Sequence, residues 1–199
     1  NINFQSFITD EKFNIKNKFK KKIFYDSLKN IKENIKEKKI FFNSFSNDFK
    51  YNLNLKELSK YKKFKRIITI GFGGSILGTQ ATNLFLQKKT NKELIFINNL
   101  NLSQIDKLNK LKDLKNSLFI IVSKSGNTIE VLSIINSLKK KANFNKNNSL
   151  VITDDRKSNL NSFAKKLKIK IITHRKYIGG RYSIFSETAM IPCYLMGVK

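Results

Sequence analysis

Hydrophobic positions in the first part of the chain follow the period of an α-helix. Phe24, Leu28, Ile31 and Ile35 are separated by four, three and four positions, which places them on one helical face with lysines opposite. The pattern predicts a basic, helical N-terminal extension over residues 1–62. We prefer a helix packed on the surface of the main domain to one that lies on a membrane.

From Arg66 onward, short apolar runs alternate with helical patterns. The runs typical of buried strands are Ile67–Ile70, Leu94–Ile97, Leu118–Val122, Leu150–Thr153 and Ile169–Thr173. One helical face is shared by Leu77, Ala81, Leu84 and Phe85, and another by Val131, Ile134, Ile135 and Leu138. Strands that alternate with helices at this pitch favour right-handed crossovers and a parallel sheet covered on both faces. We predict an α/β three-layer sandwich with a five-stranded parallel sheet over residues 63–199.

The charge of the chain suggests a polyanion partner. It carries 40 Lys and Arg residues against 14 Asp and Glu, a formal net charge of +26, with a pI near 10.1. Yet only four of the cations are arginines, whose planar fork suits base and phosphate contacts. Lys, Asn, Ile and Phe, all encoded by A/T-rich codons, are abundant throughout. We therefore predict no nucleic-acid partner and keep a polyanion-binding module as an alternative, which steep salt dependence of binding would reveal.

Cysteine and apolar content bear on the compartment. Cys193 is the one cysteine, so no intramolecular disulfide can form. The longest apolar stretch, Leu118–Val122, is far too short to span a bilayer, and the first twenty residues contain no signal-like run. We expect a cytoplasmic protein with no membrane partner. A start at Asn1 and an end at Lys199, just after an apolar helical pattern, suggest that both ends are cut.

A glycine-rich turn follows the first predicted strand. Gly71, Gly73 and Gly74 precede Ser75 and a helical pattern. Glycine lets the backbone turn sharply and approach a ligand, and a helix N-terminus offers free N–H groups to an anion. A dinucleotide-binding fingerprint is incomplete, because Ile76 stands where its third glycine belongs. The turn alone is equally compatible with a plain strand-to-helix junction.

The loop after the third predicted strand is richer in ligand groups. Ser123–Thr128 reads SKSGNT and precedes an amphipathic helix. Three hydroxyls and a glycine at a helix N-terminus form a cradle for phosphate oxygens. The Walker pattern is missing from the loop, so hydrolysis of a nucleoside triphosphate is not supported. Plain capping by Ser125 or Thr128 is the simpler alternative, but one cap needs one hydroxyl.

A third motif, GGRYSIFS, spans Gly179–Ser186. The order of strand, GGS, strand, helix, strand, SKSGNT and helix resembles the sugar isomerase domain, a family of phosphosugar-binding α/β sandwiches with a flavodoxin-like fold. The GGR-[FY]-S part is similar to a signature of the glucose-6-phosphate isomerases. The resemblance covers about residues 60–199 and identifies them as a first sugar isomerase domain.

The resemblance implies interconversion of glucose 6-phosphate and fructose 6-phosphate through a cis-enediol, without cofactor or metal, by an enzyme that is a homodimer when complete. It implies that Arg181 stabilises the enediolate. The implied phosphate-binding residues are Gly74, Ser75, Ser123, Lys124, Ser125, Gly126, Asn127 and Thr128. The family's catalytic glutamate, ring-opening histidine and further lysine, like its second sugar isomerase domain, match nothing in this chain, so we expect it to be inactive alone. The alternative is a non-catalytic sugar-phosphate sensor, which would have no use for Arg181.

Other ionisable residues have plainer interpretations. Glu130, inside the helix after the SKSGNT loop, is structural, and Glu187 lies in the first turn of the last helix, where the dipole favours it. His174 is an ordinary surface or loop histidine, although histidine suits proton transfer. Asp154 and Asp155 form a turn and an N-cap, because two adjacent carboxylates without a third ligand do not make a metal site.

Overall fold

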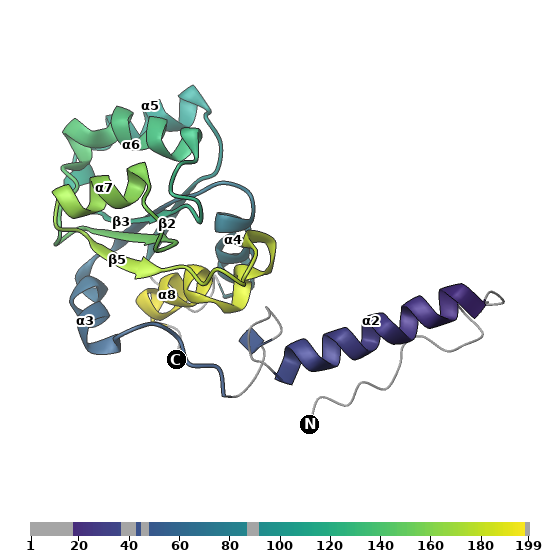
Figure 1. Cartoon of the computed structure of the whole chain (residues 1–199). Coiled ribbons are helices and arrows are strands. Elements are labelled where there is room, and N and C mark those ends of the chain that lie inside the picture. Colours follow the sequence, from purple (N-terminus) through teal and green to yellow (C-terminus); the bar gives the residue numbers. More distant parts are fainter. Residues whose placement is uncertain (1–17, 37–42, 45–47, 87–91, 198–199) are drawn as a thin grey trace. The chain divides into compact units, whose positions relative to one another are not determined.

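The computed structural model describes residues 18–36, 43–44, 48–86 and 92–197 (Figure 1). The chain divides into two compact units, Asn1–Asn43 and Ser44–Lys199. In the first unit, α2 (Lys18–Lys36) confirms the predicted helix, and the side chain of Ile35 lies outside the described residues. The predicted packing of this helix on the main domain stays a prediction. The predicted boundary between the extension, residues 1–62, and the main domain, residues 63–199, also stays a prediction.

The second unit is built on a parallel sheet whose strand order is β2-β1-β3-β4-β5. All four neighbouring pairs of strands are parallel. The strands are β1 (Arg66–Ile70), β2 (Glu93–Ile97), β3 (Leu118–Val122), β4 (Ser149–Thr153) and β5 (Lys170–Thr173). The five predicted strands are therefore confirmed, with bounds that differ by a residue where a polar side chain begins the pairing.

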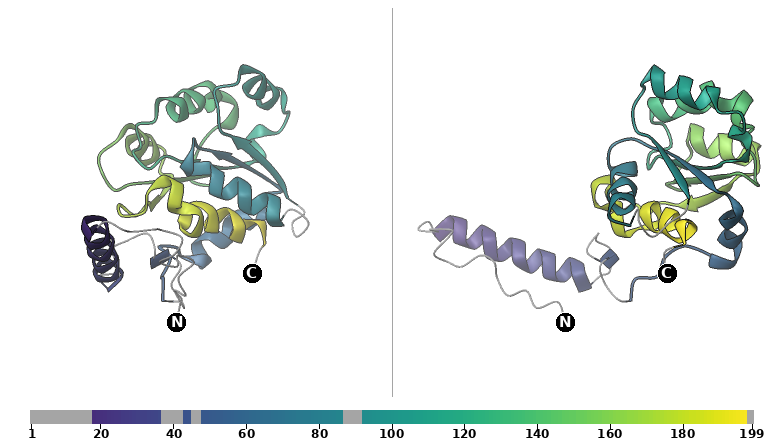
Figure 2. Two further views of the ribbon diagram at one scale, coloured as in Figure 1. Left: turned by 90° about the vertical axis from the view of Figure 1, so that its right-hand side faces the viewer. Right: turned by 180° about the vertical axis from the view of Figure 1, so that it is seen from behind.

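Helices cover both faces of this sheet, as the two views of Figure 2 show. They are α3 (Leu55–Ser59), α4 (Gly74–Leu86), α5 (Leu102–Lys110), α6 (Ile129–Ala142), α7 (Asn159–Lys166) and α8 (Glu187–Met196). Shorter 3-10 turns are η2 (Lys60–Lys63), η4 (Leu114–Asn116) and η5 (Gly180–Phe185). The predicted three-layer sandwich is confirmed.

The two layers of core follow from the alternation of side chains along each strand. In β3, Phe119 and Ile121 point to one face, where α5, α6 and α7 contribute residues such as Leu108, Ile134 and Leu160. The alternate residues Leu118, Ile120 and Val122 point to the other face, with Leu58, Tyr61, Ile191 and Leu195 from α3, η2 and α8. Since both faces are covered, every residue of β3 is buried and apolar.

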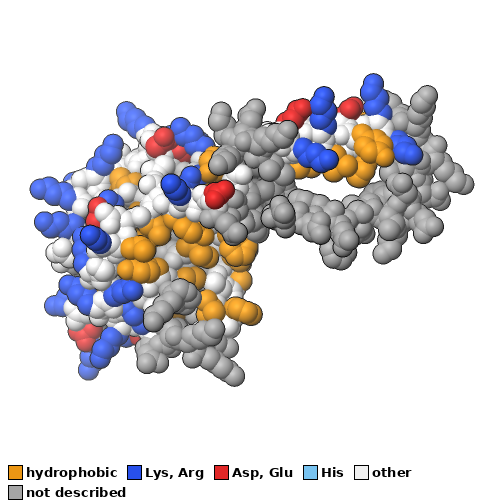
Figure 3. All heavy atoms as spheres, turned by 90° about the horizontal axis from the view of Figure 1, so that it is seen from below, with side chains coloured by type: hydrophobic (Ala, Val, Ile, Leu, Met, Phe, Trp, Pro, Cys, Tyr) orange, Lys and Arg blue, Asp and Glu red, His pale blue; other side chains and the backbone are white. Residues whose placement is uncertain are grey.

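Helix α4 forms where the sequence predicts it, but its apolar face is the exposed one. Leu77, Leu84 and Phe85 are 57%, 66% and 86% exposed, whereas Ile76 and Thr79 are buried. The small residues explain this orientation. A Cβ atom on Gly78 would lie 3.0 Å from Cα of Ile184, so α4 packs closely on η5 through residues that a hydrophobic pattern does not register. Figure 3 shows apolar side chains gathered on the underside of the second unit.

Candidate functional site

The site lies at the point where the order of the strands reverses. From β1 the chain passes to β2 on one side and then to β3 on the other, so the loops after β1 and β3 adjoin at the carboxyl edge of the sheet. A Cβ atom on Gly71 would lie 3.3 Å from the carbonyl oxygen of Val122, at the end of β3. Parallel α/β sheets bind ligands at such switch points.

The loop after β1 depends on two glycines for different reasons. Gly73 has φ +53°, a left-handed conformation that favours glycine, and it directly precedes α4. Gly74 instead needs room: a Cβ atom there would lie 2.2 Å from the carbonyl carbon of Gly180 and 2.4 Å from the amide nitrogen of Arg181. The predicted site residue Gly74 is therefore the place where the first and third motifs meet.

In the loop after β3, the three predicted hydroxyls converge. The oxygen of Ser123 lies 2.8 Å from that of Thr128, and the oxygen of Ser125 lies 3.4 Å from it. Ser123 is buried and accepts a bond from the amide of Gly126, whereas Ser125 is exposed. Thr128 occupies the N-cap position of α6 without a side-chain capping bond. Simple capping therefore does not explain the hydroxyls, which form one group at the N-terminus of a 14-residue helix.

Gly126 anchors this loop to the next strand. Its φ is +68°, and a Cβ atom on it would lie 2.1 Å from Oγ of Ser158 and 3.0 Å from Oγ1 of Thr153. Behind it, Asn127 accepts a bond at 2.9 Å from the amide of Asn159, the first residue of α7. Of the predicted phosphate-binding residues, Asn127 thus directs its side-chain oxygen toward α7.

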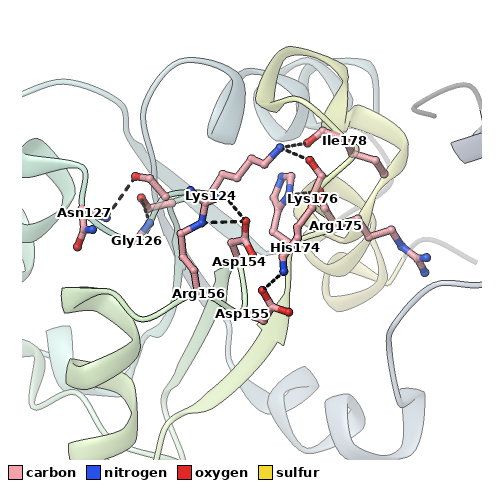
Figure 4. A network of polar contacts seen from close by, with 12 residues as sticks. Lys124, Gly126, Asn127, Asp154, Asp155, Arg156, His174, Arg175, Lys176 and Ile178 are labelled. Atoms are coloured by element: carbon pink, nitrogen blue, oxygen red, sulfur yellow. Dashed lines mark hydrogen bonds and ion pairs between the residues drawn. The ribbon is translucent and has the colours of Figure 1, made fainter. Parts of the chain in front are cut away.

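Lys124 also directs its side chain away from the hydroxyls. Its Nζ donates to the carbonyl oxygens of Lys176 and Ile178, at 2.7 and 2.8 Å (Figure 4). Burial lowers the pKa of Lys124, and the charge of Arg156 adds to this, while the charge of Asp154 raises it. The loop after β3 therefore holds two kinds of residue, those whose hydroxyls face one another and those whose side chains reach neighbouring segments.

The third motif comes to the same edge as the turn η5. Ser183 donates from Oγ to the carbonyl oxygens of Gly74, at 3.1 Å, and Gly180, at 2.6 Å. The bond to Gly74 holds the turn against the start of α4, and the bond to Gly180 lies within the turn. The side chain of Arg181 is exposed, and its backbone amide lies beside Gly74 at the start of α4.

The sequence analysis was wrong about Asp154 as a capping residue. Ser158 accepts the bond from Asn161 at 3.2 Å and caps α7 instead. Asp154 is fully buried just after β4, and Arg156 donates to its Oδ2 from Nε and Nη2, at 3.1 and 2.6 Å. Burial raises the pKa of Asp154, but the hydrogen bonds with Arg156 and Asp155 and the charge of Arg156 together outweigh it and lower the pKa to about 2. An aspartate two positions after the apolar run Leu150–Ile152, at the end of a central strand, is the signal that could have found this group.

We expect Asp154→Asn to flatten the acid dependence of stability. The pKa of Asp154 is lower in the folded state than its ordinary value of 3.8, so its contribution to stability is present above about pH 4 and is lost as the pH falls toward 2. Urea unfolding of both proteins between pH 6 and pH 2 measures the difference. Asp106→Asn, which removes an exposed carboxylate of α5, is the control. Parallel pH profiles for Asp154→Asn and the unaltered chain would contradict the prediction.

His174 is also not the surface residue that the sequence analysis expected. It is 1% exposed, and Nδ1 lies 3.1 Å from the carbonyl oxygen of Arg175. Burial lowers its pKa, although the bond to Arg175 opposes the shift. The ring lies near Lys124, Asp154 and Glu187, which come from other loops and from α8, so its burial depends on residues distant in sequence. Glu187 does lie in the first turn of α8, as predicted, and it is buried beside Arg175, whose Nε is 3.3 Å away.

Two hollows of the second unit lie away from these loops. One, of about 450 Å³, is lined by Tyr51–Asn54 and β5, and the other, of about 800 Å³, by Lys63–Arg66 and Asn147–Asn148. Neither includes a residue of the three motifs. Within the described residues, no group of three or more His, Cys, Asp or Glu side chains is placed to hold a metal ion, and no helix is long and apolar enough to cross a bilayer.

The fold and its three loops define an α/β domain of the sugar isomerase type. The chain belongs to the phosphoglucose isomerase family: the family described as "Phosphoglucose isomerase" matches residues 8–197. This confirms the family resemblance inferred from the three motifs.

Individual relatives agree with this assignment. The chain is 33% identical to the glucose-6-phosphate isomerase of Methanocaldococcus jannaschii over 154 residues, which cover 76% of this chain and 38% of that protein. It is 34% identical to the Campylobacter jejuni glucose-6-phosphate isomerase over 139 residues, or 67% and 34% of the two chains. It therefore spans little more than a third of these relatives. A hypothetical protein from Thermus thermophilus has a similar structure, with a TM-score of 0.63 at 26% identity over 72% of this chain and 36% of that one.

Proposed function

We propose that this chain is the phosphate-binding part of a glucose-6-phosphate isomerase, which interconverts D-glucose 6-phosphate and D-fructose 6-phosphate through a cis-enediol. The observation that carries the proposal is the meeting of three loops at one switch point. The three clustered hydroxyls of the loop after β3 and the backbone of the exposed Arg181 both lie at the carboxyl edge of the sheet. Membership of the phosphoglucose isomerase family supports the reaction.

The substrate phosphate, in this proposal, binds at the N-terminus of α6. Ser123, Ser125 and Thr128 supply hydroxyl donors, and the first turn of the helix supplies N–H groups and the positive end of its dipole. The backbone at Gly74 and Ser75 contributes from the loop after β1. An anion held by several fixed donors is oriented as well as bound, so phosphate binding can serve orientation at the distant reacting carbons.

Arg181 acts on the other end of the sugar. Moving a proton between adjacent carbons produces an enediolate, whose negative charge a guanidinium stabilises without changing its own protonation state. The groups that remove and return the proton, and that open the sugar ring, belong in this proposal to parts of the enzyme outside this sequence. The complete enzyme is proposed to be a homodimer.

Calorimetric titration tests the proposal directly. The purified chain is titrated with fructose 6-phosphate, 6-phosphogluconate and inorganic phosphate, and isomerisation is assayed in the same samples. We expect binding of all three and no turnover. Ser125→Ala and Thr128→Ala should each weaken phosphate binding about fivefold, because each removes a hydrogen bond worth about 1 kcal/mol.

Ser137→Ala is the matched control, since that hydroxyl bonds to Ile134 within α6, two turns from the loop. It should leave the affinity for phosphate unchanged. Turnover by the isolated chain would show that the proton-transferring groups lie within it after all. Failure of a correctly folded chain to bind any of the three compounds would overturn the proposed site.

A further inference from the structure

The segment between β5 and η5 follows an unusual path. β5 is at the edge of the sheet, three strands from β1, which is a distance of about 14 Å at the usual spacing between strands. Gly180 and Arg181 nevertheless lie against Gly74, directly after β1. Residues 174–179, the crossing segment, therefore pass over the carboxyl ends of β4 and β3 to bring Arg181 to the centre of the sheet.

Lys124 meets the crossing segment on its way. The ammonium group of Lys124 donates to the carbonyl oxygens of both Lys176 and Ile178, as Figure 4 shows. The backbone oxygen of Lys124 accepts a bond at 3.0 Å from the amide of Asp154, at the end of β4. One residue of the phosphate loop thus joins β3 to the end of β4 and to the crossing segment.

Other contacts also hold the crossing segment, and near its end the side chain of Ile178 is buried. The amide of His174 donates to Thr153 at 2.7 Å, and Arg175 is paired with Glu187. Lys176 pairs with Asp155 at 2.9 Å, but both side chains are more than half exposed, and such pairs contribute little. The bond from Lys124 to Ile178 acts at the end that leads directly into Gly179, Gly180 and Arg181.

We propose that Lys124 is a positioning residue, whose ammonium group fixes the crossing segment and thereby sets the place of Arg181 relative to the phosphate-binding hydroxyls. A sugar phosphate has a fixed length between its phosphate and its reacting carbons, so the groups that bind the two ends must keep a fixed separation. This inference rests on the proposed function. It differs from the direct phosphate contact that the family resemblance implies for this lysine.

Two ligands separate the two roles. Inorganic phosphate reports on the hydroxyl loop alone, whereas a sugar-phosphate hydroxamate, which mimics the enediolate, reports on the loop and Arg181 together. In Lys124→Met, which keeps an unbranched side chain, we expect the affinity for phosphate to change by less than about threefold and the affinity for the hydroxamate to fall about tenfold or more. In an Arg181→Gln background, Lys124→Met should have little further effect on the hydroxamate, because coupled residues are not additive.

Lys165→Met, at the exposed end of α7, is the matched control and should change neither affinity. Equal losses for phosphate and hydroxamate in Lys124→Met would show that Lys124 is a direct phosphate ligand and would overturn the positioning role. If the unaltered chain binds neither compound, the proposed function fails, and amide hydrogen exchange then tests the positioning role alone. We expect faster exchange at residues 177–181 in Lys124→Met, and unchanged exchange there would overturn the inference.

Discussion

Gly74→Ala will force η5 away from the start of α4, and we expect it to lower the free energy of unfolding by about 3 kcal/mol. The added methyl group would lie 2.2 Å from the carbonyl carbon of Gly180 and 2.4 Å from the amide nitrogen of Arg181. Both are backbone atoms, which cannot rotate away. Overpacking of this kind typically costs about 1–3 kcal/mol, and rigid neighbours place the cost at the upper end. Urea unfolding measures the change, and titration with a sugar-phosphate hydroxamate measures the displacement of Arg181.

Gly73→Ala provides a matched control one residue earlier. A Cβ atom on Gly73 would meet nothing within 4 Å, so its cost comes from the left-handed backbone, about 1 kcal/mol. It should leave the affinity for the hydroxamate unchanged. Equal losses of stability for the two variants would mean that the close approach of Gly74 to Gly180 does not matter.

Arg181→Gln should weaken binding of the hydroxamate about 10- to 100-fold. The substitution removes the charge and leaves a shorter polar side chain, and hydrogen bonds to charged groups contribute about 1.5–3 kcal/mol. Binding of inorganic phosphate should change much less, because the proposed phosphate site is at the N-terminus of α6. Isothermal titration of both ligands to the two proteins makes the comparison.

Arg66→Gln is the control for a general effect of charge. Arg66 pairs with Glu93 at the start of β1, at the opposite edge of the sheet from the site. Its loss lowers the net charge by the same amount and should leave the affinity for the hydroxamate unchanged. Equal effects of the two arginine substitutions would indicate nonspecific attraction of an anion to a basic protein and would remove Arg181 from the site.

The architecture could be predicted because strands that are buried on both faces have a simple pattern of apolar residues. β3 and β4 are covered by helices on both sides, so apolar residues fill nearly every position, and the turns between them carry glycine, serine and asparagine. The exposed face of α4 could not be predicted in this way. Besides Ile76, its packing surface includes Gly74, Gly78 and Thr79, which bring backbones close together but carry little hydrophobic signal.

The candidate site was predictable in its loops but not in the direction of its side chains. Family resemblance and the order of the motifs pointed to Gly74, Ser123 and Arg181, and the parallel sheet brings their loops to one edge. The orientation of Lys124 and the burial of His174 depend on the path of the crossing segment. That path is a long-range property, which no local pattern records.

The contact between Ser183 and Gly74 also bears on the order of events during folding. These residues are 109 positions apart, and four of the five strands, β2 to β5, lie between them in sequence. Closing so long a loop is costly until the intervening strands have paired. The loops after β1 and β3 can therefore form with the sheet, whereas Arg181 joins them only when the domain is nearly complete. If the proposed site is right, affinity for the hydroxamate is a measure of finished folding.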